Sequence, residues 1–241
     1  MILFLGDSFT WGQGLEWESL ILDKKWKVSD VDKLIPPHGN CESLPIDLYD
    51  YRIKHHFPRL VSEHFNESYH IGRFGNGGSN RNIYHILNNI EEFIYPENLK
   101  LIIIQFTHSS RHLKINENNI DSVHHQDVLE FKTAIKRVRD KYPLIKFVCL
   151  SWLPELGEEI RNVFGDEYII TFNINNKKEY GFEKLISNNF TLNSYIGVQD
   201  GHFNSKGHRL ISDSIIKHLE SNNIIMKNDF YETRGGIKKS I

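Results

Sequence analysis

The chain has 241 residues, which fits one large domain better than two small ones. Its 29 lysines and arginines nearly balance 31 aspartates and glutamates, so the net charge of −2 argues against a nucleic-acid or anionic-membrane partner. Apolar residues make up 39% of the chain, enough for a core, but no apolar run approaches the roughly 20 residues that cross a bilayer.

The beginning of the chain and its cysteine content predict a cytoplasmic protein. The first residues, MILFLGDS, contain neither the basic segment nor the cleavage site of a signal peptide. Two cysteines are present, Cys41 and Cys149, and two thiols without a secretion signal are typical of a reduced protein.

Strand and helix patterns alternate along the chain. Short apolar runs predict strands at 2–5, 68–71, 99–106, 145–151 and 167–172. Helical spacing of apolar residues predicts helices at about 51–66, 81–95, 127–141, 155–164 and 205–221. Pro58 marks a kink or a boundary in the first of these helices. The alternation predicts an α/β fold with a parallel sheet that carries helices on both faces.

Two stretches depart from this alternation. Residues 15–50 combine several prolines, many charges and two tryptophans without a clear period, and residues 223–241 are polar. We therefore expect one domain over 1–222, with an irregular insertion at about 15–50, followed by a polar tail. The tryptophans in or next to the insertion either pack it down or offer a stacking platform for a sugar or an acyl group. These tryptophans are Trp11, Trp17 and Trp26.

Polar loops follow several of the predicted strands. In a parallel α/β sheet, ligands bind outside the carboxyl ends of the strands. Ser8 ends the first strand in GDSFTWGQG, a glycine-rich loop covers 72–80, and THSSR follows the strand at 99–106. The sequence DGHFN at 200–204 directly precedes the last helix. We expect these four segments to converge on one edge of the sheet.

Ser8, Asp200 and His202 are the residue types of a serine hydrolase. A serine hydroxyl is a weak nucleophile until a histidine takes its proton, and an acid orients that histidine. Each residue alone has an ordinary structural explanation: a helix cap for Ser8, a turn residue for Asp200, and a capping or surface histidine for His202. The joint pattern favours the catalytic interpretation.

The motifs GDSFTWGQG and DGHFNSKGH resemble the first and last sequence blocks of the SGNH hydrolases, also called GDSL esterases and lipases. The resemblance covers residues 2 to about 220. It implies a flavodoxin-like three-layer α/β/α sandwich with a central parallel sheet of about five strands. It also implies that Ser8 is the nucleophile, Asp200 the acid and His202 the base. Only Gly201 separates acid from base here, whereas two residues separate them in most of the family.

The resemblance further implies an oxyanion hole. In the family this hole uses the N–H of the serine, a glycine N–H after the second strand and an asparagine side chain after the third. Ser8 and Gly78 match the first two, with Gly77 nearly as good as Gly78. Alignment with the family's Gly-x-Asn places Gln105 at the glycine and Thr107 at the asparagine, so a threonine hydroxyl replaces an amide. Other side chains that could fill this position are Asn76, Asn80 and His108.

The glycine-rich loop and its neighbours admit other interpretations. GNGGSN could cradle a phosphate at a helix N-terminus or form a plain tight turn, but it lacks a Walker lysine and the dinucleotide spacing. Three arginines near the same edge favour a polar or anionic substrate, or are merely solvated: Arg73, Arg81 and Arg111. Our candidate substrate-binding residues are Asp7, Trp11, Gly77, Asn80 and Arg111.

The histidine clusters do not predict a metal centre. His55 with His56 and His124 with His125 are adjacent pairs, and His108 and His112 have i, i+4 spacing, but no glutamate lies between them in the zinc-protease manner. We expect no metal and no cofactor.

The sequence thus predicts a serine esterase that hydrolyses a small acyl ester, such as O-acetyl on a carbohydrate, with a small-molecule or carbohydrate substrate as its partner. Two alternatives remain. One is an acyltransferase that uses the same triad, and the other is a non-catalytic binding or structural module with the same fold.

Overall fold

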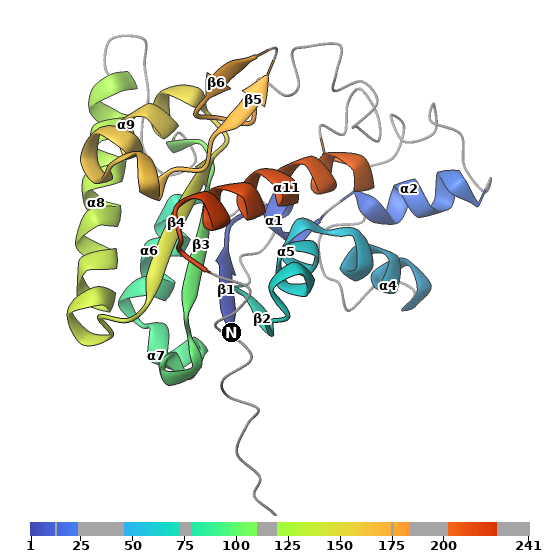
Figure 1. Cartoon of the computed structure of the whole chain (residues 1–241), viewed down its shortest axis with the longest axis horizontal. Coiled ribbons are helices and arrows are strands. Elements are labelled where there is room, and N and C mark those ends of the chain that lie inside the picture. Colours follow the sequence, from blue (N-terminus) through green and yellow to red (C-terminus); the bar gives the residue numbers. More distant parts are fainter. Residues whose placement is uncertain are drawn as a thin grey trace, which may run out of the picture.

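The computed structural model describes residues 1–12, 14–23, 46–72, 79–109, 120–174, 176–183 and 202–225. Its centre is a parallel four-stranded sheet in the order β2-β1-β3-β4 (Figure 1). The strands are β1 (Ile2–Leu5), β2 (Tyr69–Gly72), β3 (Leu101–Phe106) and β4 (Lys146–Ser151). Leu5 of β1 pairs with Gly72 on one side and with Ile104 on the other, so the carboxyl ends of these three strands meet at one edge.

A single bridge extends the sheet beyond β4. Cys149 pairs in parallel with Ile169, and the N–H of Ile170 donates to the carbonyl of Cys149 at 2.7 Å. The strand order is thus 2-1-3-4 with a one-residue fifth position, which follows the flavodoxin-like order. The full strand predicted at 167–172 is wrong, because the 3-10 helix η4 (Asp166–Tyr168) occupies its first half. After the bridge, β5 (Phe172–Ile174) pairs antiparallel with β6 (Lys177–Glu179) as a separate hairpin.

Helices cover both faces of the sheet, which confirms the predicted three-layer α/β arrangement (Figure 1). One face carries α6 (Asn80–Asn88), α8 (Ile120–Lys141) and α9 (Pro154–Phe164). The other carries α5 (Phe57–Phe65) and α11 (Ser205–Ser221). These helices lie near their predicted positions, and α8 begins earlier than the predicted 127.

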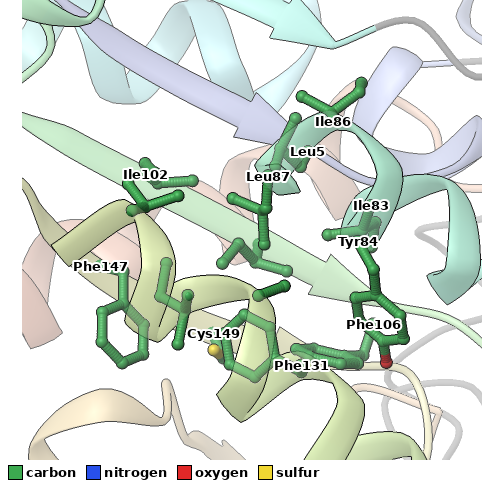
Figure 2. Packing of buried hydrophobic residues seen from close by; sticks show 14 of the residues in the cluster. Leu5, Ile83, Tyr84, Ile86, Leu87, Ile102, Phe106, Phe131, Phe147 and Cys149 are labelled. Atoms are coloured by element: carbon green, nitrogen blue, oxygen red, sulfur yellow. The ribbon is translucent and has the colours of Figure 1, made fainter. Parts of the chain in front are cut away.

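The core consists of two clusters, one on each face of the sheet. Because side chains alternate along a strand, Leu3 and Leu5 pack into one cluster while Ile2 and Phe4 pack into the other. Figure 2 shows the first cluster, in which Leu5 and the strand residues Ile102 and Phe106 meet aromatic and aliphatic side chains of the helices. These strands are buried on both faces, which explains their continuous apolar sequences.

Three further helical segments differ from the sequence-based expectations. The helix predicted at 51–66 is two helices, α4 (Ile46–His55) and α5, separated at His56. Pro58 lies in the first turn of α5, where a missing N–H costs nothing. Residues 15–22, expected to be irregular, form α2 (Leu15–Leu22), while 24–45 lie outside the described residues. The helix predicted at 81–95 ends at Asn88 and is followed by α7 (Ile90–Phe93) and the 3-10 helix η2 (Pro96–Asn98).

In the described part of the chain, no helix combines the length and apolar character that a membrane crossing requires.

Candidate active site

The turn after β1 presents Ser8 at the start of a helix. The short helix α1 (Ser8–Trp11) begins directly after Asp7, whose carboxylate accepts the N–H of Phe9 at 3.0 Å. Asp7 is therefore the N-cap, and Ser8 is the first helical residue. The hydroxyl of Ser8 is not the helix cap, which was the structural alternative to a catalytic role.

A side chain from the neighbouring strand holds this turn. The side-chain oxygen of Gln105, near the end of β3, accepts the hydroxyl of Thr10 at 2.8 Å and the N–H of Asp7 at 3.3 Å. Gly6 is required here because a Cβ at this position would overlap the hydroxyl of Thr10. The family alignment places Gln105 only at a glycine position, and no local pattern marks it as the support of the Ser8 turn.

Ser8 and His202 lie within hydrogen-bond distance of each other. Nε2 of His202 is 2.9 Å from Oγ of Ser8, although 194 residues separate them. Both side chains are partly exposed. The imidazole of His202 packs against the ring of Phe9, with 5.1 Å between ring centroids, so α1 positions both the hydroxyl and one face of the histidine. This geometry would let the imidazole take a proton from the hydroxyl.

The segment that carries His202 is fixed from two sides. Asn204 caps α11, since its side chain accepts the N–H of Gly207 at 3.1 Å. Glu18 of α2 accepts the N–H and the hydroxyl of Ser205 at 2.7 and 2.8 Å. A carboxylate is favoured at a helix N-terminus. Burial and the neighbouring carboxylate of Glu18 raise the pKa of Tyr51 to about 12. Helix α2 therefore attaches to the segment that carries His202.

Thr107 and Asn80 bind each other at the carboxyl ends of the strands. The N–H of Thr107 donates to Oδ1 of Asn80 at 2.9 Å, and Nδ2 of Asn80 donates to the carbonyl of Thr107 at 3.1 Å. Asn80 is fully buried and also donates to Asp127 at 2.6 Å. Its amide is therefore engaged within the protein, and Asn80 holds the loop that contains Thr107.

The structure does not place every predicted site residue. Gly77, Gly78, Arg111 and Asp200 lie outside the described residues, as do Asn76 and Arg73. Trp11 is partly exposed, and the guanidinium of Arg52 lies 5.8 Å from its ring centre. Arg81 is exposed on α6.

An aromatic group that sequence reasoning missed lies beside the Ser8–His202 pair. Trp152, directly after β4, packs against Phe9 at a tilt of 32°, with 4.5 Å between ring centroids. His108 lies 6.1 Å from Trp152 by the same measure, and both side chains are partly exposed. The available signal was the position of Trp152 after a strand, at the same sheet edge as Ser8.

The histidines have diverse environments. His124 is buried with Nδ1 3.1 Å from the hydroxyl of Ser109, whereas His125 is exposed and pairs with Glu159 at 2.6 Å. Within the described ranges, no three histidine, cysteine, aspartate or glutamate side chains gather as a metal site. His208, on α11, is fully buried, and burial lowers its pKa well below the ordinary value.

The chain was compared with known proteins at the levels of family, sequence and structure. No protein-family model matches it, and no curated protein sequence matches it. Its fold is similar to that of a solved structure described by the statement "The active site of a carbohydrate esterase displays divergent catalytic and non-catalytic binding functions". The TM-score is 0.53 at 16% sequence identity, and the match covers 91% of this chain and 67% of the other. At this identity the similarity shows the fold alone: an α/β fold with a helix-flanked parallel sheet, shared with a carbohydrate esterase.

Proposed function

We propose that the chain is a serine esterase of the SGNH or GDSL type. Its substrate is a small acyl ester, with O-acetyl on a carbohydrate as the favoured case. The observation that carries the proposal is the 2.9 Å distance between Oγ of Ser8 and Nε2 of His202. The fold similarity to a carbohydrate esterase supports the same class of reaction.

The proposed reaction has two steps. Nε2 of His202 takes the proton of Ser8 while Oγ attacks the ester carbonyl, which gives a tetrahedral oxyanion. Collapse of this intermediate breaks the bond to the alcohol, His202 returns the proton to the departing oxygen, and the acyl group stays on Ser8. Water, deprotonated by His202, then attacks the acyl-enzyme and releases the acid and the free serine. Asp200 is assigned to orient His202.

Three donors are assigned to the oxyanion: the N–H groups of Ser8 and Gly78 and the hydroxyl of Thr107. The N–H of Ser8 belongs to the first turn of α1, where N–H groups have no acceptor within the helix. The N–H of Thr107 donates to Asn80, so Thr107 contributes through its side chain and not through its backbone. Loss of one such donor lowers kcat by about 10²–10³ in other enzymes. A threonine in place of an amide therefore predicts a slower or more specialised esterase.

A fluorophosphonate probe tests this proposal, because it reacts with an activated serine. The probe should modify Ser8 of the wild type, and Ser8→Ala should lose both the label and the hydrolysis of an aryl acetate while keeping its fold by circular dichroism. Ser214→Ala is a matched control, since the hydroxyl of Ser214 donates to a carbonyl within α11, at Leu210. Wild-type turnover in Ser8→Ala would overturn the proposal.

A non-catalytic binding module is the second candidate, and the absence of the family asparagine at position 107 favours it. This candidate predicts binding of an acetylated sugar without turnover and without labelling of Ser8. An acyltransferase would instead label at Ser8 and release more acylated acceptor than free acid when a sugar is supplied. Product analysis by mass spectrometry distinguishes the three outcomes.

A further inference from the structure

A buried carboxylate of α8 binds Asn80, the residue that holds the loop containing Thr107. Asp127 is in α8 and is fully buried. Its Oδ2 accepts Nδ2 of Asn80 at 2.6 Å and the hydroxyl of Ser109 at 2.6 Å. The hydroxyl of Tyr84 donates to its Oδ1. A carboxylate with these partners is tied to α6 and to the loop after β3.

The hydrogen-bonding capacity of the Asp127 carboxylate determines which way the side-chain amide of Asn80 points. An ionised carboxylate only accepts hydrogen bonds, so the side of Asn80 that faces Asp127 must be its NH₂ group. Oδ1 of Asn80 then faces the N–H of Thr107, and the second hydrogen of Nδ2 faces the carbonyl of Thr107. Ser109 has one hydroxyl hydrogen, which it donates to Asp127, so it accepts from Nδ1–H of His124. Asp127 thus sets the direction of the hydrogen bonds around it.

The side-chain amide of Asn80 provides the hydrogen bonds that a neighbouring strand would otherwise give to the backbone of Thr107. The register between β1 and β3 ends at Leu5 and Ile104, whereas β3 continues to Phe106. The backbone of Thr107 therefore lies beyond the β1 ladder, and the side chain of Asn80 satisfies both its N–H and its carbonyl. Continued alternation along β3 places Thr107 on the same face as Gln105, which holds the Ser8 turn.

We infer that Asp127 is a positioning residue: by orienting Asn80, it holds Thr107 beside Ser8 so that the threonine hydroxyl faces the developing oxyanion. This inference rests on the proposed esterase function. Asp127 itself touches no reacting atom. It acts through Asn80, which couples α8 to the chemistry at the edge of the sheet.

The test is a double-mutant cycle with Asp127→Asn and Thr107→Val in the full chain, using hydrolysis of an aryl acetate. An asparagine at 127 has a single oxygen acceptor and no charge, and its NH₂ group must face either Tyr84 or the pair Asn80 and Ser109, so the hydrogen bonds that fix the orientation of Asn80 are weakened. We expect Asp127→Asn to lower kcat by about tenfold to a hundredfold with little change in KM, because misplacement of a catalytic group by about 1 Å costs this much. Thr107→Val should lower kcat by at least as much.

The coupling between the two substitutions separates positioning from a general structural role. If Asp127 acts through Thr107, Asp127→Asn should cost no more than about twofold in kcat once Thr107 is valine, because coupled residues are not additive. Multiplicative losses would overturn the inference and assign Asp127 to stability alone. Tyr84→Phe is the matched control, since it removes one donor to the same carboxylate and leaves Asn80 in place. It should lower the melting temperature with kcat within about twofold of wild type, and a loss as large as that of Asp127→Asn would contradict the inference.

Two further measurements cover a folding failure of Asp127→Asn and test the proposed function separately. If Asp127→Asn does not fold, Asn80→Ala replaces it in the cycle, because it removes the same contacts to Thr107 at the first residue of α6. Labelling of Ser8 by a fluorophosphonate reports on the proposed function separately. A wild-type protein that labels and turns over, combined with wild-type kcat in both Asp127→Asn and Asn80→Ala, would overturn the positioning role alone.

Discussion

The side-chain oxygen of Gln105 accepts the hydroxyl of Thr10 at 2.8 Å, which joins the strand β3 to the helix that begins at Ser8. Both residues are buried, and the same oxygen also accepts the N–H of Asp7. The direction in which Ser8 leaves the sheet therefore depends on a neighbouring strand as well as on its own turn.

Replacement of Gln105 by leucine should disturb this turn. Gln105→Leu keeps the approximate volume but leaves the N–H of Asp7 and the hydroxyl of Thr10 without their acceptor. Each buried group left unsatisfied costs about 1–3 kcal/mol in the free energy of unfolding. We expect a loss of this order in urea unfolding and at least a tenfold loss of kcat in ester hydrolysis. Thr10→Val removes only one of the two contacts and should cost less, and wild-type kcat in Gln105→Leu would contradict the supporting role.

A buried ion pair supports the segment after α1. Glu16 of α2 and Arg52 of α4 are each 1% exposed, and their side chains approach to 2.6 Å. Glu16 also accepts the N–H of Gly14 at 3.1 Å. Removal of one partner leaves a buried charge uncompensated, so Arg52→Met should lower the free energy of unfolding by about 3–5 kcal/mol. The double variant Glu16→Leu, Arg52→Met should lose less free energy of unfolding than the sum of the two single variants. Additive losses would show that the pair is not coupled.

The parts of the fold that depend on local pattern were predictable from the sequence. The strands of the parallel sheet are short apolar runs. The alternation of these runs with helical patterns predicted helices on both faces of the sheet. The reduction of the predicted fifth strand to one bridge was not predictable, because residues 166–168 form a 3-10 turn directly before the bridge at Ile169. Likewise, the apolar residues around 51–66 read as one helix, and the division at His56 depends on where α4 and α5 pack.

The candidate site was predictable only where a motif carries the chemistry. The motifs brought Ser8 and His202 together as candidates, and the structure places their side-chain atoms 2.9 Å apart. Gln105 and Asp127 have no such motif, because their roles depend on hydrogen bonds to residues far away in the sequence, at Asp7 and Asn80. A polar residue inside a strand or helix gives no sign of the buried partner that it meets.

A buried histidine predicts that stability falls in mild acid. Burial, together with the nearby charge of Arg52, lowers the pKa of His56 to about 3, while the histidine of an unfolded chain has a pKa of about 6.5. His56 therefore stays neutral in the folded state while the unfolded state takes up a proton as the pH falls below about 6.5. Protonation of the unfolded state draws the equilibrium toward unfolding, by about 2 kcal/mol between pH 7 and pH 5.

Urea unfolding at the two pH values measures this effect. His56→Gln removes the titrating group, so its difference in unfolding free energy between pH 7 and pH 5 should be about 2 kcal/mol smaller than that of the wild type. His85→Gln, at an exposed position on α6, is the control and should leave the difference unchanged. An unchanged difference in His56→Gln would show that His56 does not stay neutral in the fold.

Trp152 should contribute to the recognition of a sugar and not to the chemistry at Ser8. Its ring packs at a tilt against Phe9 and meets Phe182 edge-on at 5.0 Å, so both neighbours hold it in place. Part of its surface stays exposed beside His108. A fixed aromatic face of this kind suits the apolar face of a sugar ring, and we take the roughly 0.5–1.5 kcal/mol of an aromatic pair as the scale of such a contact. We therefore expect Trp152→Leu to lower kcat/KM for an acetylated sugar by about two- to tenfold more than for a small aryl acetate.

The measurement is the ratio of kcat/KM for the two substrates, because any displacement of Phe9 and His202 would lower both values together. Trp152→Phe keeps an aromatic ring and should recover much of the lost preference. An equal loss on both substrates in Trp152→Leu would assign Trp152 to packing beside the Ser8–His202 pair and would leave the recognition of the sugar to other residues.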